Sequence, residues 1–160
     1  MEKTATSKAW EAPVPVCNGA ALRKATRRLS ALYDDILAPS GLRLSQHSVL
    51  VHIKRAGTPT MTDLARDLVL DRSALSHNLK PLERDGFVTL FKDKIDKRST
   101  RVSLTASGQR KLAESKALWA IAQKRFEGAF GAAKASAMRE LLFEVCSDEF
   151  NEKFLSLPDR

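Results

Sequence analysis

Hydrophobic residues recur at intervals of three and four along most of the chain, a pattern that predicts a mainly helical protein. The first stripe, from Leu22 to Ile36, predicts a helix over about residues 18–38 that ends near Pro39. Residues 1–16 lack this spacing and are predicted to form a flexible N-terminal arm.

Residues with helix-capping side chains separate the next apolar stripes. Ser45 is predicted to cap a second helix. Thr60 begins the pattern T-x-x-D with Asp63, which resembles a capping box and predicts a short third helix. Asp71 is a good N-cap for a fourth helix. The chain therefore predicts two short helices joined by a tight turn.

The fourth helix has one apolar face, on which Leu75, Leu79 and Leu82 recur. Pro81 is expected to interrupt and kink this helix, because it cannot donate a hydrogen bond to the carbonyl of His77. The residues before Pro81 are therefore the ones expected to read a partner.

The pattern changes from helical to β-type after Gly86, which is expected to end the helix in the left-handed conformation. Residues 87–92 and 101–104 are rich in β-forming residues and flank a polar loop, which predicts a two-stranded hairpin. Thr105 is predicted to cap a long helix, and a last helix is predicted from about Ser136.

Short helices followed by a hairpin predict a winged helix-turn-helix, here over about residues 45–104. The predicted fold is mainly α with a small β-hairpin wing, as a single domain over residues 17–160. The flanking helices, at about 18–38 and 105–156, carry apolar stripes that the winged helix cannot bury, so they are predicted to mediate dimerisation.

The polar face of the fourth helix suits DNA binding, because the second helix of such a unit enters the major groove. Ser73 and Arg84 are expected to contact phosphates, and Ser76, His77 and Lys80 to contact bases or nearby phosphates. A surface helix with an ordinary solvated polar face remains the alternative.

The hairpin tip carries a second cluster of charges. Asp96 is expected to accept from the Arg98 guanidinium and hold it extended toward the minor groove, and Arg101 to brace the wing or contact phosphate. An exposed turn with ordinary charges is the alternative. The predicted DNA-binding residues are Arg72, Ser73, Ser76, His77, Asn78, Lys80, Arg84, Lys94, Asp96, Lys97, Arg98 and Arg101.

The net charge of +8 is distributed unevenly. Between Arg72 and Arg101 there are eight basic and four acidic residues, whereas Arg139 to Arg160 contains three basic and six acidic ones. A positive centre with an acidic tail fits a polyanionic partner attached to a separate module, although basic composition can also serve solubility alone.

The sequence shows few features of other protein classes. It has no glycine-rich phosphate loop, H-E-x-x-H or nucleophile elbow, so we expect no enzyme, no cofactor and no metal site. No apolar run is long enough to span a membrane and no signal-peptide core is present, so a cytoplasmic protein is expected. Cys17 and Cys146 fit no zinc spacing, and Cys146 is predicted to be a core thiol.

The segments DRSALSHNLKPLERDGFV and DKRSTRVSLTASG resemble the MarR family of bacterial transcription regulators, and the resemblance extends over about residues 17–155. It implies a homodimer that presents one winged helix per subunit to a palindromic DNA operator. It also implies regulation, more often repression, that responds to a small-molecule effector.

The resemblance implies two modes of sensing. One is a small, often aromatic, anion bound between the dimer helices and the winged helix, with candidate contacts from Trp10, Arg23, Tyr33, His47 and His52. His47 could meet a carboxylate or a phenol, or could be an ordinary packed histidine. A zinc site formed by His47 and His52 is not expected, because two residues five positions apart do not lie on the same face of a helix.

The alternative mode is oxidation of an N-terminal cysteine, for which Cys17 is the candidate. Gly19 occupies the position where the peroxide-sensing branch has its cysteine, which argues against a one-cysteine switch. An alternative of another class is a dimeric interaction protein that does not bind DNA. That reading leaves the basic helix and wing unexplained.

Overall fold

The computed structural model describes residues 16–158. Its helices and strands, in chain order, are α1 (Asn18–Leu37), the 3-10 turn η1 (Ala38–Ser40), α2 (Leu44–Ala56), α3 (Met61–Asp67), α4 (Arg72–Arg84), β1 (Val88–Lys92), β2 (Thr100–Leu104), α5 (Ala106–Phe130), α6 (Ala132–Val145) and α7 (Asp148–Ser156). The strands pair antiparallel, with Val88 opposite Leu104 and Lys92 opposite Thr100. This is the predicted mainly α architecture with a β-hairpin wing.

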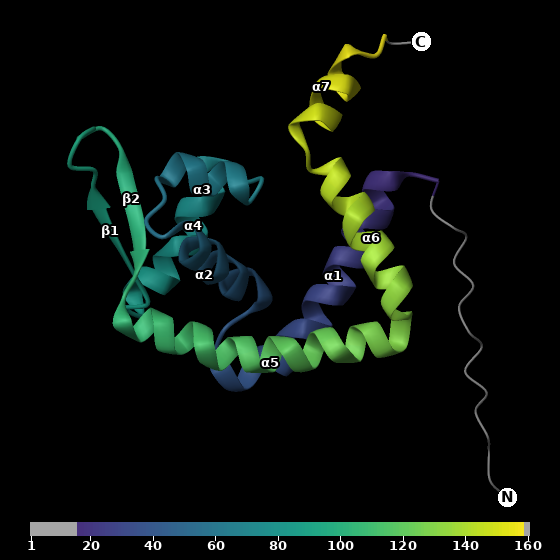
Figure 1. Ribbon diagram of the computed structural model, residues 1–160, viewed down its shortest axis with the longest axis horizontal. Coiled ribbons are helices and arrows are strands. Elements are labelled where there is room, and N and C mark those ends of the chain that lie inside the picture. Colours follow the sequence, from purple (N-terminus) through teal and green to yellow (C-terminus); the bar gives the residue numbers. More distant parts are fainter. Residues whose placement is uncertain (1–15, 159–160) are drawn as a thin grey trace, which may run out of the picture.

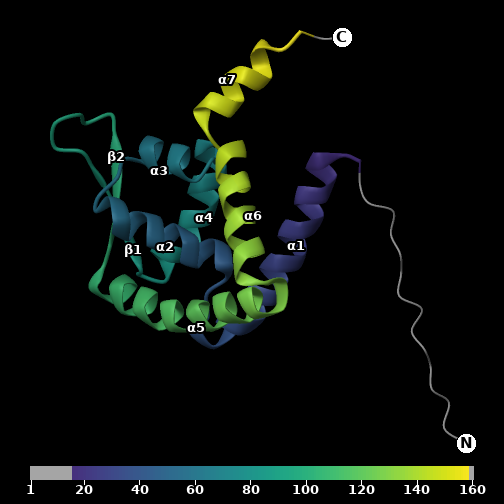
Figure 2. The ribbon, with the colours of Figure 1, turned by 45° about the vertical axis from the view of Figure 1, so that its right-hand side comes forward.

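The long helix α5 connects two groups of elements (Figure 1). Helices α2, α3 and α4 and the hairpin gather at its N-terminal end, and α1 and α6 lie toward its C-terminal end (Figure 1). The turned view separates α1 from α6, and α7 extends beyond both (Figure 2). No helix in residues 16–158 is both long enough and apolar enough to cross a membrane.

One hydrophobic core joins the elements of the winged helix. Leu50, Leu75 and Leu82 have no exposed surface, and Val102 of β2 is equally buried. Leu112 of α5 belongs to the same cluster. Because a buried aliphatic side chain contributes roughly 1.5–3 kcal/mol, this core fixes α4 and the wing relative to α2 and to the start of α5.

Three predicted helix caps are confirmed. Thr60 Oγ1 accepts a hydrogen bond from Asp63 N–H (3.1 Å), and Asp71 Oδ1 accepts one from Ala74 N–H (2.7 Å). Thr105 caps α5 in the same way. The turn between α3 and α4 also contains a positive φ of 51° at Val69, which is strained for a β-branched residue.

The predicted cap of α2 is wrong, since Arg43 rather than Ser45 holds the N-cap position. The Gln46 carboxamide accepts from Arg43 N–H (2.9 Å), and the Asp34 carboxylate accepts from Leu44 N–H (2.6 Å). Asp34 belongs to α1, so the cap comes from a residue that local sequence does not bring close.

Two further predictions about helices are wrong. Pro81 does not interrupt α4, which continues to Arg84, because a proline in the last turn removes only a hydrogen bond near the helix end. The predicted last helix is two helices. Ser147 Oγ accepts from Phe150 N–H (3.1 Å) and donates to the Glu144 carbonyl (2.7 Å), so it ends α6 and begins α7.

Cys146, which follows α6, is exposed rather than part of a core. Large apolar side chains share this exposure, among them Phe143 (81%), Phe154 (66%) and Leu155 (73%). The C-terminal helices thus have an apolar surface without a partner in residues 16–158.

The junction between the hairpin and α5 is unusually close. A Cβ atom at Gly108 would lie 1.9 Å from the Phe87 carbonyl oxygen. Thr105 Oγ1 donates to the Gly86 carbonyl (2.7 Å) and accepts from Gly108 N–H (3.0 Å). Glycine at position 108 therefore allows the backbone of α5 to touch the start of β1.

We predict that Gly108→Ala destabilises the protein by roughly 1–3 kcal/mol or more, because the methyl group forces the two backbones apart. Gly128→Ala, in the same helix but with open space around its Cβ, should instead be neutral or stabilising by about 0.5–1 kcal/mol. Urea unfolding followed by circular dichroism measures both, and equal stability of the two variants would contradict the close contact.

Candidate nucleic-acid interface and adjoining cavities

Helix α4 presents a polar face opposite its buried leucines. Arg72, Ser73, His77, Lys80 and Arg84 are exposed. Two other predicted contact residues, Ser76 and Asn78, are half-buried. The face brings together six of the seven residues predicted on this helix, whereas the helical spacing places Asn78 on the flank beside Leu82. Its cations and short polar side chains suit phosphates and base edges.

Two of these side chains already have hydrogen bonds within the chain. Ser76 Oγ donates to the Arg72 carbonyl (2.8 Å), so it can offer a ligand only its acceptor lone pairs. Arg84 Nε donates to Asp85 Oδ1 (2.8 Å), and this hydrogen bond lowers the pKa of the Asp85 carboxyl. Arg84 is thus partly neutralised, whereas Lys80 has no ion-pair partner in residues 16–158.

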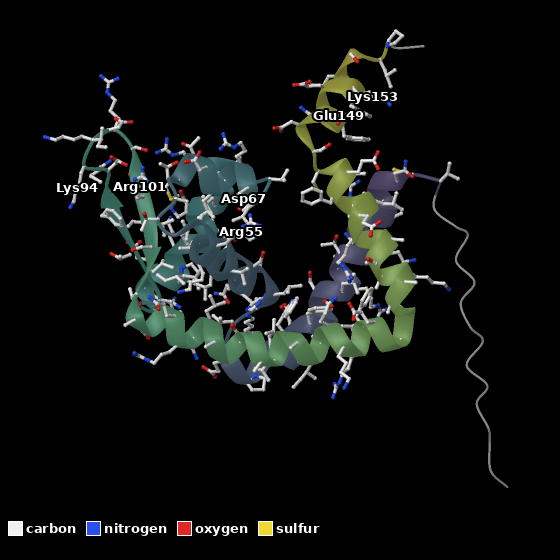
Figure 3. All side chains as sticks on the ribbon, in the orientation of Figure 1. Arg55, Asp67, Lys94, Arg101, Glu149 and Lys153 are labelled. Atoms are coloured by element: carbon white, nitrogen blue, oxygen red, sulfur yellow. The ribbon has the colours of Figure 1, made fainter. Side chains whose placement is uncertain are left out.

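The wing tip carries three exposed cations that form no ion pair within residues 16–158: Lys94, Lys97 and Arg98. Lys94 lies at the free end of the hairpin, on the side of the molecule away from Glu149 and Lys153 of α7 (Figure 3). These charges are available to a polyanion without breaking an existing pair.

Asp96 does not hold the Arg98 guanidinium, contrary to expectation. Its Oδ1 accepts from the backbone N–H of Arg98 (3.0 Å), and its carbonyl accepts from Ser99 N–H (2.9 Å). A short acidic side chain in a turn bonds more readily to nearby backbone than to a long flexible cation. Asp96 therefore shapes the turn, and the Arg98 side chain is left exposed.

Asp93 organises the wing, and sequence reasoning missed it as a site residue. It is only 7% exposed. Its Oδ2 accepts from Arg101 Nε, and its Oδ1 accepts from the N–H groups of Ile95 (2.7 Å) and Asp96 (3.1 Å). The Arg101 hydrogen bond, followed by the two backbone ones, lowers the pKa of Asp93 to about 2. The sequence signal for this role of Asp93 was an aspartate that precedes a loop ending in arginine.

Arg101 braces the wing against the helix-turn-helix. Its Nη1 donates to the Thr58 carbonyl (2.7 Å), in the turn between α2 and α3. Val102 N–H donates to the Pro59 carbonyl (3.1 Å) beside it. The orientation of the hairpin is therefore tied to the turn that precedes α3.

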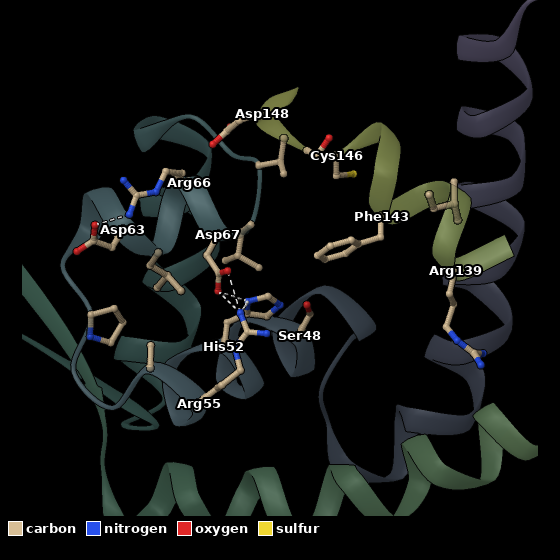
Figure 4. Close-up of a pocket in the computed structure, with 17 residues that line it drawn as sticks. Ser48, His52, Arg55, Asp63, Arg66, Asp67, Arg139, Phe143, Cys146 and Asp148 are labelled. Atoms are coloured by element: carbon tan, nitrogen blue, oxygen red, sulfur yellow. Dashed lines mark hydrogen bonds and ion pairs between the residues drawn. The ribbon is translucent and has the colours of Figure 1, made fainter. Parts of the chain in front are cut away.

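The residues predicted to bind an effector do not form one site. His52 lines an open cavity of about 960 Å³ between α2–α3 and α6 (Figure 4). There His52 Nδ1 lies 2.6 Å from Asp67 Oδ2, and Arg55 also bonds Asp67. These contacts lower the Asp67 pKa, with the His52 hydrogen bond as the largest cause.

His47 lines a different cavity, of about 450 Å³, between α2 and α5. Tyr33 is engaged elsewhere, since its hydroxyl donates to Gln123 of α5 (2.9 Å). Arg23 and Cys17 are exposed near the start of α1. Trp10 lies outside the described residues.

The His47 cavity is mostly apolar and is lined by three cations, of which Arg55 is paired with Asp67. Its lining residues are Leu44, His47, Ser48, Val51, Lys54, Arg55, Leu112, Lys116 and Trp119. The His47 ring is buried and stacks on Trp119 with ring centroids 6.2 Å apart. Sequence reasoning did not identify Lys54, Lys116 or Trp119 as site residues. Trp119 comes seven residues after Leu112, a spacing that places both on the same face of the helix.

Comparisons with known proteins agree with this geometry. The family model described as "MarR family" matches residues 42–100. The transcriptional activatory protein BadR of Rhodopseudomonas palustris is 38% identical over 72 residues, which cover 43% of this chain and 41% of BadR. The match thus spans less than half of that relative.

Two similar structures cover most of the chain. The M. tuberculosis transcriptional regulator MOSR, solved in complex with DNA, is 32% identical with a TM-score of 0.69, and the alignment covers 81% of this chain and 98% of MOSR. The transcriptional repressor CouR, solved bound to a 23-mer DNA duplex, is 26% identical with a TM-score of 0.75, and the alignment covers 82% of this chain and 93% of CouR. The chain therefore belongs to the MarR family, whose members are transcription regulators and not enzymes.

Proposed function

We propose that the protein is a homodimeric repressor that binds a palindromic operator and leaves it when a small organic acid occupies the His47 cavity. The observation that carries the DNA-binding part is a wing with three unpaired cations in the described chain, joined through Arg101 to the turn between α2 and α3. A reader of duplex DNA needs phosphate contacts for position and groove contacts for sequence, and these two surfaces supply both.

In this proposal α4 enters the major groove and Arg98 enters the minor groove. Lys80 and His77 reach base edges or nearby phosphates, while Ser73 lies at the start of the helix, where N–H groups also favour phosphate. Lys94 and Lys97 flank Arg98 and add phosphate contacts that strengthen binding at low salt.

A second copy of the chain is the proposed partner of the C-terminal helices. Phe143, Phe154 and Leu155 expose apolar surface that a monomeric soluble protein rarely retains. A twofold dimer would bury this surface and place two α4 helices about one DNA turn apart, which matches a palindromic operator. MOSR and CouR, which have a similar fold, were both solved in complex with DNA.

The effector part of the proposal depends on where the His47 cavity lies. It is bounded by α2, which belongs to the winged helix, and by α5, which leads to the proposed dimer helices. A ligand wedged between them would change the angle between the two parts and the spacing of the two α4 helices. Lys54 and Lys116 have no ion-pair partner in residues 16–158, so an anionic ligand would meet free cations there.

We propose repression because a dimer that occupies an operator blocks transcription without a further contact surface. The relatives include both a repressor, CouR, and an activatory protein, BadR. The same fold therefore serves both repression and activation among these relatives.

We predict that Arg98→Ala weakens binding to an operator obtained by in vitro selection by roughly 1–3 kcal/mol, because an exposed guanidinium is lost from a groove. Fluorescence anisotropy at several salt concentrations measures the change. Arg125→Ala, which removes an exposed arginine from α5, is the control and should bind normally.

Unchanged affinity in Arg98→Ala would remove this residue from the interface. Failure of the selection to enrich any duplex would refute sequence-specific DNA binding and favour a dimeric interaction protein.

We predict that Asp93→Asn weakens DNA binding by less than Arg98→Ala does, because Asp93 positions the wing without facing the DNA. Asp35→Asn, an exposed carboxylate on α1, changes the charge equally and should have no effect. An Asp93→Asn variant with the affinity of the parent protein would show that the wing needs no such support.

We also predict how the wing responds to pH. An unfolded aspartate titrates near pH ~3.9, and the pKa of Asp93 in the folded protein is lowered to about 2. Its contribution to stability is therefore complete above pH ~4 and is lost as the pH falls through about 2. The NMR chemical shifts of the Ile95 and Asp96 amides should stay constant from pH 7 to pH ~4 and change only below pH ~4. A transition centred above pH ~4 would contradict the hydrogen bonds that Asp93 accepts.

Phe154→Asp should convert the dimer to a monomer of 17.7 kDa, because a buried unpaired carboxylate opposes association. Ile95→Asp is the matched control, since Ile95 is 98% exposed at the wing tip and lies outside the proposed interface. Light scattering after size exclusion gives the mass. A Phe154→Asp dimer as stable as the parent would exclude α7 from the interface.

A further inference from the structure

One apolar side chain at the wing tip contributes nothing to the fold. Ile95 lies in the loop between β1 and β2 and is 98% exposed, more than any other large hydrophobic side chain in residues 17–158. The loop keeps its shape without this side chain, because Asp93 Oδ1 accepts from the backbone N–H groups of Ile95 (2.7 Å) and Asp96 (3.1 Å). Loop positions usually carry glycine, proline, asparagine, aspartate or serine, whose turn chemistry isoleucine lacks. Neither packing nor the turn therefore accounts for an isoleucine here, and contact with a partner does.

The charges beside Ile95 indicate which partner it meets. Lys94 precedes it and Lys97 and Arg98 follow it closely, and none of these three cations has an ion-pair partner in residues 16–158. Lys94 lies at the free end of the hairpin (Figure 3). An aliphatic side chain among three free cations fits a polyanion that has an apolar surface between its charges. The minor groove of duplex DNA is such a surface, since its sugars form apolar walls between two rows of phosphates, and aliphatic side chains are known to enter it.

The loop is anchored in a way that would hold Ile95 in a groove. Asp93, which accepts from the N–H of Ile95, also accepts from Arg101 Nε. Arg101 Nη1 in turn donates to the Thr58 carbonyl (2.7 Å), in the turn between α2 and α3. The backbone that carries Ile95 is therefore connected through two side chains to the helix-turn-helix, and little additional chain has to be ordered when the wing binds.

We propose that Ile95 enters the minor groove beside Arg98 and makes the wing select A·T pairs at the position that Ile95 covers, by excluding the exocyclic amino group of guanine. This inference rests on the proposed DNA binding and adds a residue that determines part of the sequence preference.

The chemistry of the groove floor explains the selection. A·T pairs present only the acceptors A N3 and T O2 there, whereas a G·C pair adds the N2 amino donor of guanine. This amino group projects from the centre of the floor, where an aliphatic side chain would lie. Ile95 has no acceptor to offer it, so the amino group would lose water without gaining a hydrogen bond. Over an A·T pair the floor leaves room for the side chain.

The roles of Ile95 and Arg98 can be separated experimentally. The Arg98 guanidinium is attracted by the negative potential of a narrow groove, and its phosphate neighbours make binding depend on salt. Ile95 carries no charge, so it changes the preference for base pairs without changing the salt dependence. A variant of each residue should therefore alter a different measurement.

The first experiment uses fluorescence anisotropy on duplexes derived from the operator obtained by in vitro selection. Each A·T pair is replaced in turn by 2,6-diaminopurine·T, which adds the amino group to the minor groove and leaves the major-groove edge read by α4 unchanged. At the position that Ile95 covers, the parent protein should lose affinity roughly fivefold to tenfold, because a buried donor is left unpaired. A G·C pair at this position should bind equally weakly, and inosine·C, which lacks the amino group, should restore binding.

Variants then identify the residue that causes the penalty. Ile95→Asn supplies an acceptor for the added amino group and should remove the penalty, whereas Ile95→Val keeps an aliphatic side chain and should keep it. Ile121→Asn makes the same substitution at an exposed isoleucine of α5 and is the matched control, which should keep the full penalty. Arg98→Ala should bind more weakly and still show the penalty at the Ile95 position.

Two further measurements exclude indirect effects. Ile95→Asn should unfold at the same temperature as the parent protein, because the side chain is 98% exposed. Its binding should also keep the salt dependence of the parent, whereas Arg98→Ala should lower the slope of log affinity against log salt by about one.

The outcomes separate this inference from the proposed function. If diaminopurine weakens binding equally in the parent protein and in Ile95→Asn, or at no position in the parent, the role of Ile95 is overturned. Operator binding that depends on Arg98 would stand in both cases. If the selection enriches no duplex, the proposed DNA binding fails and the inference fails with it.

Discussion

The contact between Gly108 and the Phe87 carbonyl joins the two halves of the molecule. Any side chain at position 108 would collide with the backbone of the hairpin, so α5 can begin where it does only because this residue is glycine. Thr105 strengthens the junction by capping α5 and donating to the Gly86 carbonyl. The start of α5 is therefore fixed against the start of the hairpin.

A second link holds the other face of the wing. Arg101 bonds Asp93 inside the hairpin and the Thr58 carbonyl outside it, so the wing is attached both to α5 and to the turn before α3. This arrangement leaves Arg98 and its neighbouring lysines without partners while their backbone is fixed. A polyanion that binds them meets a preorganised surface and orders little additional chain. The cavity that contains His47 lies between α2 and α5.

Local chemistry explains which elements the sequence predicted. The caps at Thr60, Asp71 and Thr105 depend on bonds to residues three positions away, and the turn at Gly86 depends on a positive φ of 72°. Some failures came from partners or packing that local sequence does not show. Arg43 rather than Ser45 holds the N-cap position of α2, where Asp34 of α1 accepts from the next N–H, and Cys146 after α6 is exposed.

The sequence by itself determined the order of helices and strands, the polar face of α4 and the positive charge of the wing, since these follow from periodicity, capping and composition within short segments. The tertiary structure alone decided which side chains share a site. It placed His47 on Ser115 and Trp119 and His52 on Asp67, although both histidines lie on α2. The partners of each histidine lie on other helices, and only packing of the core brings them within bonding distance. The partners of Asp93 are local to the hairpin, where the pairing of the two strands brings Arg101 to it.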